Sequence, residues 1–497
     1  MSEDFYSLAH PHYYEHVDRF RFSDEYAKMV RGLLPLTWST KRSGPWLMVW
    51  NGVGVKQQGF KIHVSSTQAN AERTLRLVAA ECIEHDVTFK VAGDHVMLQV
   101  LNGRAIGRGN AGKFMTIYPP TEGVFRSLIE RLYESTRDTD LAGAYVLSDR
   151  RYKDSRLLSY RFGGFTPLRQ LRVDGTSGHY LRAPDGRFVA DARLPYFELP
   201  AWITDPFPAE ASNGSEDAPL KQRYRVLTAL KFSNCGGVYQ ALDEHTGHIV
   251  IVKEARPYTG EFNLGGTFTD ARALLEWEWT MLKRLSHLEC VPQAIDFFKE
   301  WEHSFLVMEL VPGATLWAFW ATREHLFAPY VCWPGALDAF LPRFKGFALS
   351  LLDAIEAVHS AGVIINDLST RNVMIDPATL RVRLIDFEAA VAIDTVVPGV
   401  TDVGLALHTP GFRNPDRKTR GFATPTDDFY AAGMLLYTAI APAQEHFTLN
   451  PASREVFLDG MVRLGVPDAA RSAIRALFRG EPDEARRVLH TINPETT

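Results

Sequence analysis

Four polar residues in the second half of the chain have the types and the order that phosphoryl transfer needs. Asp367 and Asn372 are five residues apart in NDLSTRN, and Asp386 follows fourteen residues later at the edge of the apolar run VRLI. Upstream, the apolar run IVIV ends in Lys253. A carboxylate can orient an acceptor hydroxyl, an amide and a second carboxylate can hold Mg²⁺, and an ammonium can bind nucleotide phosphates. We therefore predict that Asp367 is catalytic and that Asn372 and Asp386 bind the metal. Lys253 would contact the nucleotide.

An acidic partner for this lysine is expected in the helical pattern over 270–285. Glu278 lies in that pattern. An ion pair with Lys253 would aim the ammonium group at the α- and β-phosphates. Glu276 is the second choice for the same role.

The loop that would cover the phosphates is altered. LKFSNCGGVYQA keeps Gly236 and Val238, whereas Lys231 and Ser233 stand where two further glycines are usual. Gly236 and Val238 are predicted to contact the nucleotide, and a plain β-hairpin is the alternative interpretation.

The order of these segments resembles that of protein kinases. Glu309 and Leu310 would form the hinge beside the base, and HTPGFRNPD and TDDFYAAG resemble an activation-segment end and the helix after it. Two departures matter. Asn366 replaces the arginine that commonly reads an activation-loop phosphate, so we expect activity without loop phosphorylation. Glu388 replaces the glycine after the metal-binding Asp-Phe pair and adds a charge near the metal.

The first half of the chain contains one suggestive strand pattern. In QGFKIHVSS the alternation places Phe60, Ile62 and Val64 on one face and Lys61 and His63 on the other. A solvated polar face is the alternative interpretation of that pattern.

Together, the two halves resemble the lyase and kinase portion of class III lanthipeptide synthetases over residues 1–490. The resemblance rests on QGFKIHVSS, NGRAIGRGNAGKFMTIYP, YRFGGF, SNCGGVYQALDEHTGHIVIVKEARP and NDLSTRNVMID. These enzymes phosphorylate Ser and Thr of a ribosomal precursor peptide with a leader and then eliminate the phosphate. The resemblance implies an N-terminal domain similar to phosphothreonine lyases, with His63 as general acid, Lys90 as base and Lys61 on the phosphate or a carbonyl.

The same resemblance implies a phosphate cradle. Arg108 and Tyr118 would bind the phosphate, Arg161 would complete the cradle and Arg150 is a weaker choice. Lys113 is set aside, because a regular strand would put it on the face opposite Tyr118.

The elements that must position these residues form two units. Short strands mixed with helical patterns before residue 205 favour an α+β domain, and strands followed by long helices after 220 favour a two-lobed kinase-like domain. DPFPAEASNGSEDAPL has the composition of a linker. We predict an α+β protein with a phosphothreonine-lyase-like domain at 1–204, a linker at 205–220 and a protein-kinase-like domain at 221–490.

Composition argues against a nucleic-acid-binding or membrane protein. The chain has 497 residues, 46% of them hydrophobic and 23% charged, with a formal net charge of -5, so nothing draws it to nucleic acid. It contains 4 cysteines without a CxxC pair and no apolar run of the roughly 18 residues that span a bilayer. We expect a cytoplasmic enzyme without membrane contact.

Three functions follow. The first is a dehydratase that uses ATP or GTP with Mg²⁺ to phosphorylate a precursor peptide and then forms dehydroalanine or dehydrobutyrine. The second is a Ser/Thr protein kinase with a non-catalytic N-terminal binding domain, and the third is a pseudokinase scaffold. The cyclase domain of the family is not expected here: either the chain is part of a longer protein or a separate cyclase closes the rings.

Overall fold

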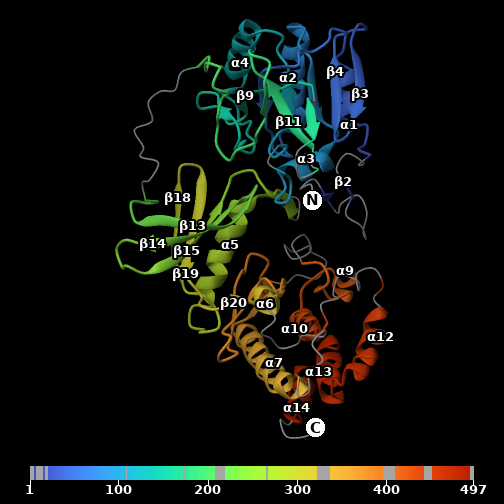
Figure 1. The fold of residues 1–497 in the computed structure, drawn as a ribbon, viewed down its shortest axis with the longest axis vertical. Coiled ribbons are helices and arrows are strands. Elements are labelled where there is room, and N and C mark those ends of the chain that lie inside the picture. Colours follow the sequence, from blue (N-terminus) through green and yellow to red (C-terminus); the bar gives the residue numbers. More distant parts are fainter. Residues whose placement is uncertain are drawn as a thin grey trace.

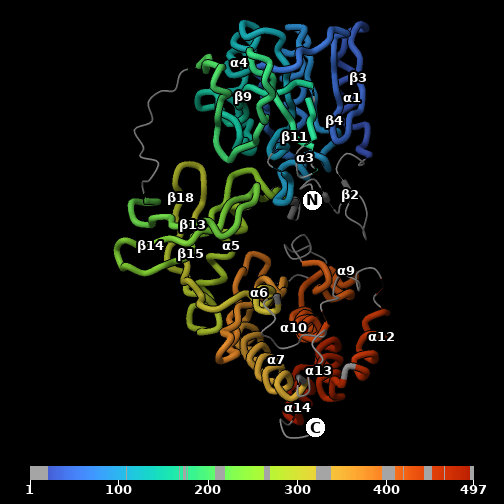
Figure 2. Tube along the Cα trace, viewed as in Figure 1, coloured from blue at the N-terminus to red at the C-terminus, as the bar shows by residue number. Residues whose placement is uncertain are grey.

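The computed structural model contains an N-terminal α+β domain, a small β-rich lobe and a larger helical lobe, which follow one another along the chain (Figures 1 and 2). The structure describes all residues except 1–4, 7–14, 17–20, 108, 167, 172–174, 176, 208–218, 265–266, 322–335, 396–408, 442–449, 451 and 493–497. Most of the predicted linker therefore lies outside the described residues, and its boundaries stay a prediction.

A seven-stranded antiparallel sheet forms the centre of the N-terminal domain. Its strand order is β3 (Ser39–Ser43), β4 (Trp46–Trp50), β6 (Phe89–Ala92), β7 (Met115–Ile117), β5 (Gln58–Val64), β9 (Leu158–Gly164) and β8 (Arg150–Arg151). The domain's helices are α1 (Glu25–Arg31), α2 (Ala71–Glu84), α3 (His95–Asn102) and α4 (Glu122–Thr136). A three-stranded sheet joins β10 (Arg169–Leu171), β11 (Ser177–Arg182) and β12 (Phe188–Ala190), and β1 (Phe5–Tyr6) pairs with β2 (Glu15–His16).

Alternation along β5 divides the two faces of this sheet. Phe60 stacks on Phe125 of α4 at 5.0 Å between ring centroids, and Ile62 is fully buried in the same core. Lys61 and His63, which alternate with these two residues along the strand, must therefore point to the other face. The helix-covered face holds the core, and the opposite face is left for polar side chains.

The small lobe is a five-stranded antiparallel sheet with one long helix. The strand order is β13 (Tyr224–Ser233), β14 (Gly236–Asp243), β15 (Ile249–Ala255), β19 (His303–Glu309) and β18 (Ala294–Glu300). Helix α5 (Ala271–Arg284) follows β15 and the short pair β16 (Phe262–Leu264) and β17 (Thr267–Thr269). These elements agree with the predicted strands and with the helix over 270–285.

The large lobe is mostly helical. Its helices are α6 (Leu316–Ala321), α7 (Ala336–Ser360), α9 (Asp416–Arg420), α10 (Pro425–Ile440), α12 (Ser453–Gly460), α13 (Asp468–Phe478) and α14 (Pro482–His490). Its short strands are β20 (Ala314–Thr315), β21 (Val363–Ile364), β22 (Val373–Ile375), β23 (Val382–Leu384) and β24 (Val391–Ala392), with single 3-10 turns at Ile393–Thr395 and Met461–Leu464.

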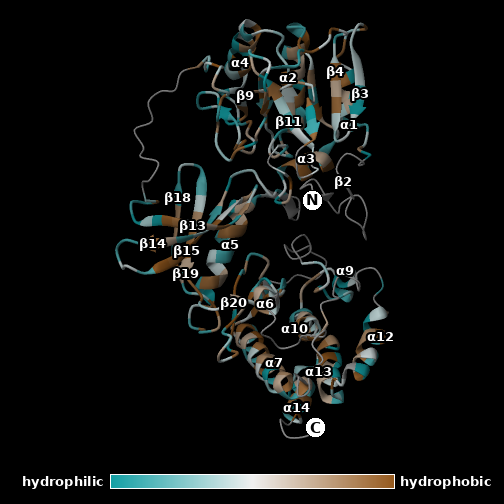
Figure 3. Ribbon diagram, viewed as in Figure 1, coloured by the Kyte–Doolittle hydropathy of each residue, from teal (hydrophilic) through white to brown (hydrophobic). Residues whose placement is uncertain are grey.

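The long helix α7 shows why this lobe is helical. It carries apolar residues along most of its length (Figure 3), and those at helical spacing are fully or almost fully buried: Phe340, Phe344, Phe347, Leu351, Ile355 and Val358. Helix α10 starts with Pro425 after a capping box between Thr424 and Asp427, and nearly all of it is buried. Within the described helices, none combines the length and the apolarity needed to cross a membrane.

Candidate active sites

The predicted ammonium–carboxylate pair of the nucleotide site is present. Lys253 on β15 donates from Nζ to Glu278 Oε1 on α5 at 2.6 Å and to Asp386 Oδ1 at 3.1 Å. Burial alone would lower the pKa of Lys253, but Asp386 and Glu278 raise it above its usual value, so the lysine stays charged. Glu276 is exposed, which rules out the second choice for this pairing.

The catalytic loop brings the other two predicted residues together. Asn372 Nδ2 donates to the backbone oxygen of Asp367 at 2.9 Å and to its Oδ2 at 3.3 Å, while the Thr409 amide donates to Oδ1 at 2.7 Å. Burial raises the pKa of Asp367, and the neighbouring Asp386 adds to the shift. The side-chain amide of Asn372 thus donates to Asp367 through its nitrogen, and its oxygen is the atom that a divalent ion would bind.

The backbone around these residues is held in uncommon conformations. Asn366 and Asp386 have φ angles of 70° and 72°, in the left-handed region that non-glycine residues rarely adopt. Asp428 at the start of α10 accepts from the amides of Ile365 and Asn366, both at 2.8 Å, and from His359 Nε2 at 2.8 Å. This carboxylate therefore takes the structural role that the sequence suggested.

A nucleotide with Mg²⁺ fits this set of residues. Gly236 has a φ of 152°, and a Cβ there would lie 1.8 Å from the Glu254 oxygen, so only glycine allows the loop to approach β15. A cavity of about 80 Å³ lies between this loop, Val238, Lys253 and Asp386. Among the described residues no group of three or more His, Cys, Asp or Glu side chains could hold a metal by itself. Asn372 and Asp386 would supply only part of the ligands of Mg²⁺, which usually takes the rest from phosphates and water.

The predicted hinge residues lie at the end of β19. The Glu309 carboxylate is bound by Arg383 at 2.6 and 2.7 Å, so only its backbone remains to contact a base. Leu310 follows and is partly exposed.

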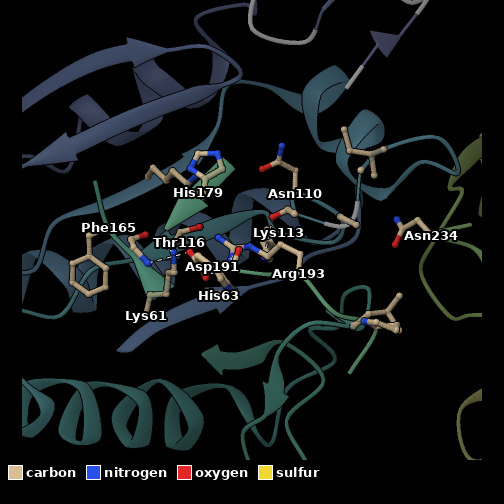
Figure 4. A pocket seen from close by; sticks show the side chains of 18 of the residues that line it. Lys61, His63, Asn110, Lys113, Thr116, Phe165, His179, Asp191, Arg193 and Asn234 are labelled. Atoms are coloured by element: carbon tan, nitrogen blue, oxygen red, sulfur yellow. Dashed lines mark hydrogen bonds and ion pairs between the residues drawn. The ribbon is translucent and has the colours of Figure 1, made fainter. Parts of the chain in front are cut away.

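A second, larger cavity of about 1020 Å³ lies on the polar face of the N-terminal sheet (Figure 4). The strand register places Lys90 (β6), Thr116 (β7) and His63 (β5) side by side in one row across this face. The described lining has a single carboxylate, Asp191, against six Lys and Arg side chains: Lys61, Lys90, Arg104, Lys113, Arg193 and Arg256. Such a cavity favours an anion.

A buried carboxylate orients the central histidine. His63 Nδ1 makes a very short contact with Asp149 Oδ2, and both side chains are almost fully buried. Lys113 Nζ lies 3.9 Å from Asp149 Oδ1. Burial and the nearby Lys113 and Lys61 lower the pKa of His63, and Asp149 opposes them. With Nδ1 committed to Asp149, the His63 nitrogen available to a substrate is Nε2.

The cavity lysines differ in basicity and in their contacts. Lys90 Nζ lies 3.9 Å from the centre of the Trp46 ring, and burial, with Lys113 and Arg193, lowers its pKa to about 7. Lys61 Nζ donates to the Gly164 oxygen at 2.7 Å, and its pKa is also lowered, chiefly by burial. Of these two lysines, Lys90 is the one whose pKa lies near neutrality.

Lys113 is a correction to the sequence analysis. Strand β7 begins only at Met115, so the alternation that excluded Lys113 does not reach it. The lysine follows Gly112, whose φ is 71°, and its Nζ donates to the Gly109 oxygen at 2.9 Å beside the cavity. Tyr118 also lines the cavity, and burial raises the pKa of its hydroxyl. The prediction that both side chains cannot point inward was therefore wrong.

The predicted arginine cradle is only partly present. Arg150 is paired with Tyr160 on the helix-covered face and binds Asp205 at 2.5 Å, so the prediction that it binds the phosphate was wrong. Arg161 Nη2 donates to Asp191 Oδ1 at 2.8 Å, whereas its buried Nε and Nη1 have no hydrogen-bond partner in the described structure. Arg108 lies outside the described residues.

Several residues at this cavity were missed by reasoning from sequence. Asp149 lies in the loop between α4 and β8, Asp191 directly follows β12, and Arg193 binds the Asp191 side chain at 2.5 Å. His179 reaches the cavity from β11. Nothing in the spacing marks them, since they come from three separate parts of the chain, near residues 149, 179 and 191–193, and only the fold brings these parts together.

The fold and both sites define a protein kinase domain preceded by a separate α+β domain with an anion-binding cavity. Residues 26–219 match the RamC N-terminal domain family and residues 226–458 match the protein kinase domain family. The chain belongs to the proteins that join these two domains, which confirms the resemblance to class III lanthipeptide synthetases.

Individual relatives agree with this assignment. A probable SapB synthase of Streptomyces coelicolor is 34% identical over 422 residues, which cover 82% of this chain and 42% of that protein. The serine/threonine-protein kinase PknL of Mycobacterium bovis is 30% identical over 225 residues, 45% of this chain and 50% of the kinase. The DNA damage-responsive kinase RqkA of Deinococcus radiodurans is 30% identical over 220 residues, 44% of this chain and 30% of that protein. The chain thus matches half or less of the length of each of these relatives.

Proposed function

We propose that the chain dehydrates Ser and Thr residues of a ribosomal precursor peptide in two steps, phosphorylation in the kinase domain and elimination in the N-terminal cavity. The observation that carries the proposal is the row of Lys90, Thr116 and His63 in a cavity lined by six lysine and arginine side chains. A kinase whose N-terminal domain only bound peptide would not need a histidine oriented by a buried carboxylate.

In the first step the kinase residues transfer the γ-phosphoryl group from ATP to a side-chain hydroxyl. Asp367 orients the hydroxyl and accepts its proton, and Lys253 holds the phosphates. Asn372 and Asp386 would hold Mg²⁺, which neutralises charge on the transferring phosphoryl group when it is bound.

In the second step the phosphorylated residue enters the cavity, where Lys61, Lys113 and Arg193 bind the phosphate dianion. Lys90, neutral because its pKa is about 7, removes the Cα proton. The electron pair forms the Cα–Cβ double bond, and the Cβ–O bond breaks. His63 Nε2 donates a proton to the bridging oxygen, so hydrogen phosphate leaves.

The substrate itself helps to charge His63. In the empty cavity, burial and the surrounding cations lower its pKa. A bound dianion offsets the cations, so the imidazolium paired with Asp149 becomes the favoured form. Thr116 Oγ1 is buried and makes no hydrogen bond in the described structure, which leaves it available to the substrate between the two catalytic groups.

Mass spectrometry of a candidate precursor peptide incubated with the chain, ATP and Mg²⁺ tests the proposal. Loss of one water per modified residue supports it. A gain of phosphate without dehydration would support a kinase with a non-catalytic N-terminal domain instead. His63→Ala should convert the first outcome into the second by leaving phosphopeptide, and a variant that still dehydrates at the normal rate would refute the assignment of His63.

A further inference from the structure

The N-terminal domain reaches into the nucleotide site of the kinase domain. Arg104, which follows α3, makes a two-pronged ion pair with Glu388, with Nη1–Oε1 and Nη2–Oε2 distances of 2.7 and 2.8 Å. Glu388 is two residues after the metal-binding Asp386. Arg104 thus lines the nucleotide cavity as well as the larger N-terminal cavity.

The backbone around this arginine holds the phosphate-covering loop. Asn234, at the turn between β13 and β14, donates from Nδ2 to the Gly103 oxygen at 3.1 Å, and its amide donates to the Arg104 oxygen at 3.4 Å. The Gly260 amide donates to the Asn102 oxygen at 2.8 Å. The segment after α3 is therefore hydrogen-bonded to the nucleotide loop of the small lobe. These bonds hold the backbone of Arg104 beside the nucleotide cavity.

The charge balance of the nucleotide cavity depends on this arginine. The described lining has three cationic and four anionic side chains: Arg104, Lys231 and Lys253 against Glu254, Glu278, Asp386 and Glu388. Removing Arg104 leaves Glu388 without its ion-pair partner beside the place where a triphosphate must bind. An extra net negative charge at short range disfavours a polyanionic ligand.

We propose that Arg104 is a positioning residue of the kinase site: it neutralises Glu388, so that nucleotide binding requires the N-terminal domain to be docked. The inference rests on the proposed kinase function and goes beyond it, because it makes the nucleotide site composite. It also accounts for a glutamate at a position where kinases usually have glycine, since the partner domain supplies the compensating charge.

Isothermal titration of the full chain with the ATP analogue AMP-PNP and Mg²⁺ tests this without a peptide substrate. Arg104→Gln should weaken binding about tenfold, the order expected for one partly screened unit charge near the phosphates. Adding Glu388→Gln to that variant restores the net charge and should return the affinity to within about threefold of the original.

A matched control is the other two-pronged ion pair between the domains. Arg151 binds Glu302 at 2.7 and 2.7 Å, and neither residue lines either cavity. Arg151→Gln should bind AMP-PNP like the original chain. An equal loss in this control would show that only interface integrity matters and would overturn the proposal.

The remaining outcomes are also decisive. Unchanged binding by Arg104→Gln, or a double variant no better than the single one, would refute the role of Arg104 and leave the kinase function intact. Absence of AMP-PNP binding by the original chain would instead refute the kinase function itself. If Arg104→Gln unfolds, Arg104→Lys provides the second test, because it keeps the charge, loses the two-pronged geometry and should bind within about threefold of the original chain.

Discussion

Replacing Asp149 by asparagine should stop elimination while leaving phosphorylation unchanged. The side chain is fully buried, contacts His63 Nδ1 and lies 3.9 Å from Lys113 Nζ. Asparagine keeps the shape but removes the charge that favours the imidazolium form of His63. A hydrogen bond to a charged group contributes about 1.5–3 kcal/mol, and a unit charge at about 4 Å contributes about 4 kcal/mol at an effective dielectric constant of 20.

These two contributions overlap, so we expect the loss of transition-state stabilisation to be about 3–4 kcal/mol in total. This corresponds to a decrease of about 10²–10³-fold in the elimination rate. The assay is phosphate release from a synthetic phosphoserine peptide, which bypasses the kinase. Asp205→Asn is the matched control. This carboxylate also binds a basic side chain, that of Arg150, but on the helix-covered side of the sheet. Elimination at the original rate by Asp149→Asn would refute the assignment of His63 as the acid, whereas equal losses in both variants would indicate a general effect on folding.

Four other predictions concern the elimination base, the catalytic loop and the activation segment. Lys90→Ala should reduce the elimination rate at least about 10³-fold and accumulate phosphopeptide. If only Lys113→Ala has this effect, Lys90 is not the base. In the original chain the elimination rate should rise with pH as Lys90, whose pKa is lowered to about 7, loses its proton, and should fall again where His63 can no longer supply one; a rate independent of pH would contradict this. Asp367→Asn should abolish phosphorylation and spare elimination from the phosphoserine peptide. Phosphatase treatment of the purified chain should leave its kinase activity unchanged, because Asn366 stands where an arginine would bind an activation-loop phosphate and donates to the Ala389 oxygen at 3.0 Å.

Much of the kinase site is predictable from sequence because its chemistry is local. Asp367 and Asn372 lie on one short loop, and Lys253 and Asp386 each directly follow an apolar run, so spacing alone nearly determines their geometry. The choice between Glu276 and Glu278 was also open to reasoning, since residues two positions apart on a helix point to nearly opposite sides and only one of them can face β15. What the sequence could not indicate is the partner of Glu388, which comes from a domain 284 residues away along the chain.

The N-terminal cavity is less predictable for a physical reason. Its strands bring Lys61, Lys90 and His63 onto one face by alternation, and that part follows from the pattern. Loops supply the rest, and alternation does not extend into loops, as the position of Lys113 demonstrates. Asp149 has no signature at all, because a buried carboxylate that orients a histidine is recognisable only from its contact.

The placement of the two cavities gives the reaction order a structural basis. Ser233 and Asn234 of the nucleotide loop line the N-terminal cavity, and Arg104 and Ser233 line both cavities. Under the proposed function, a phosphorylated side chain that leaves the kinase domain would meet Arg104 and then a lining with five further lysine and arginine side chains and one carboxylate. This difference in charge would draw the phosphate away from the carboxylates of the kinase site, where it would inhibit the next transfer, and toward His63 and Lys90, the residues proposed to expel it. Under this arrangement an unmodified hydroxyl has no electrostatic reason to enter the elimination cavity, so charge alone would separate substrate from intermediate.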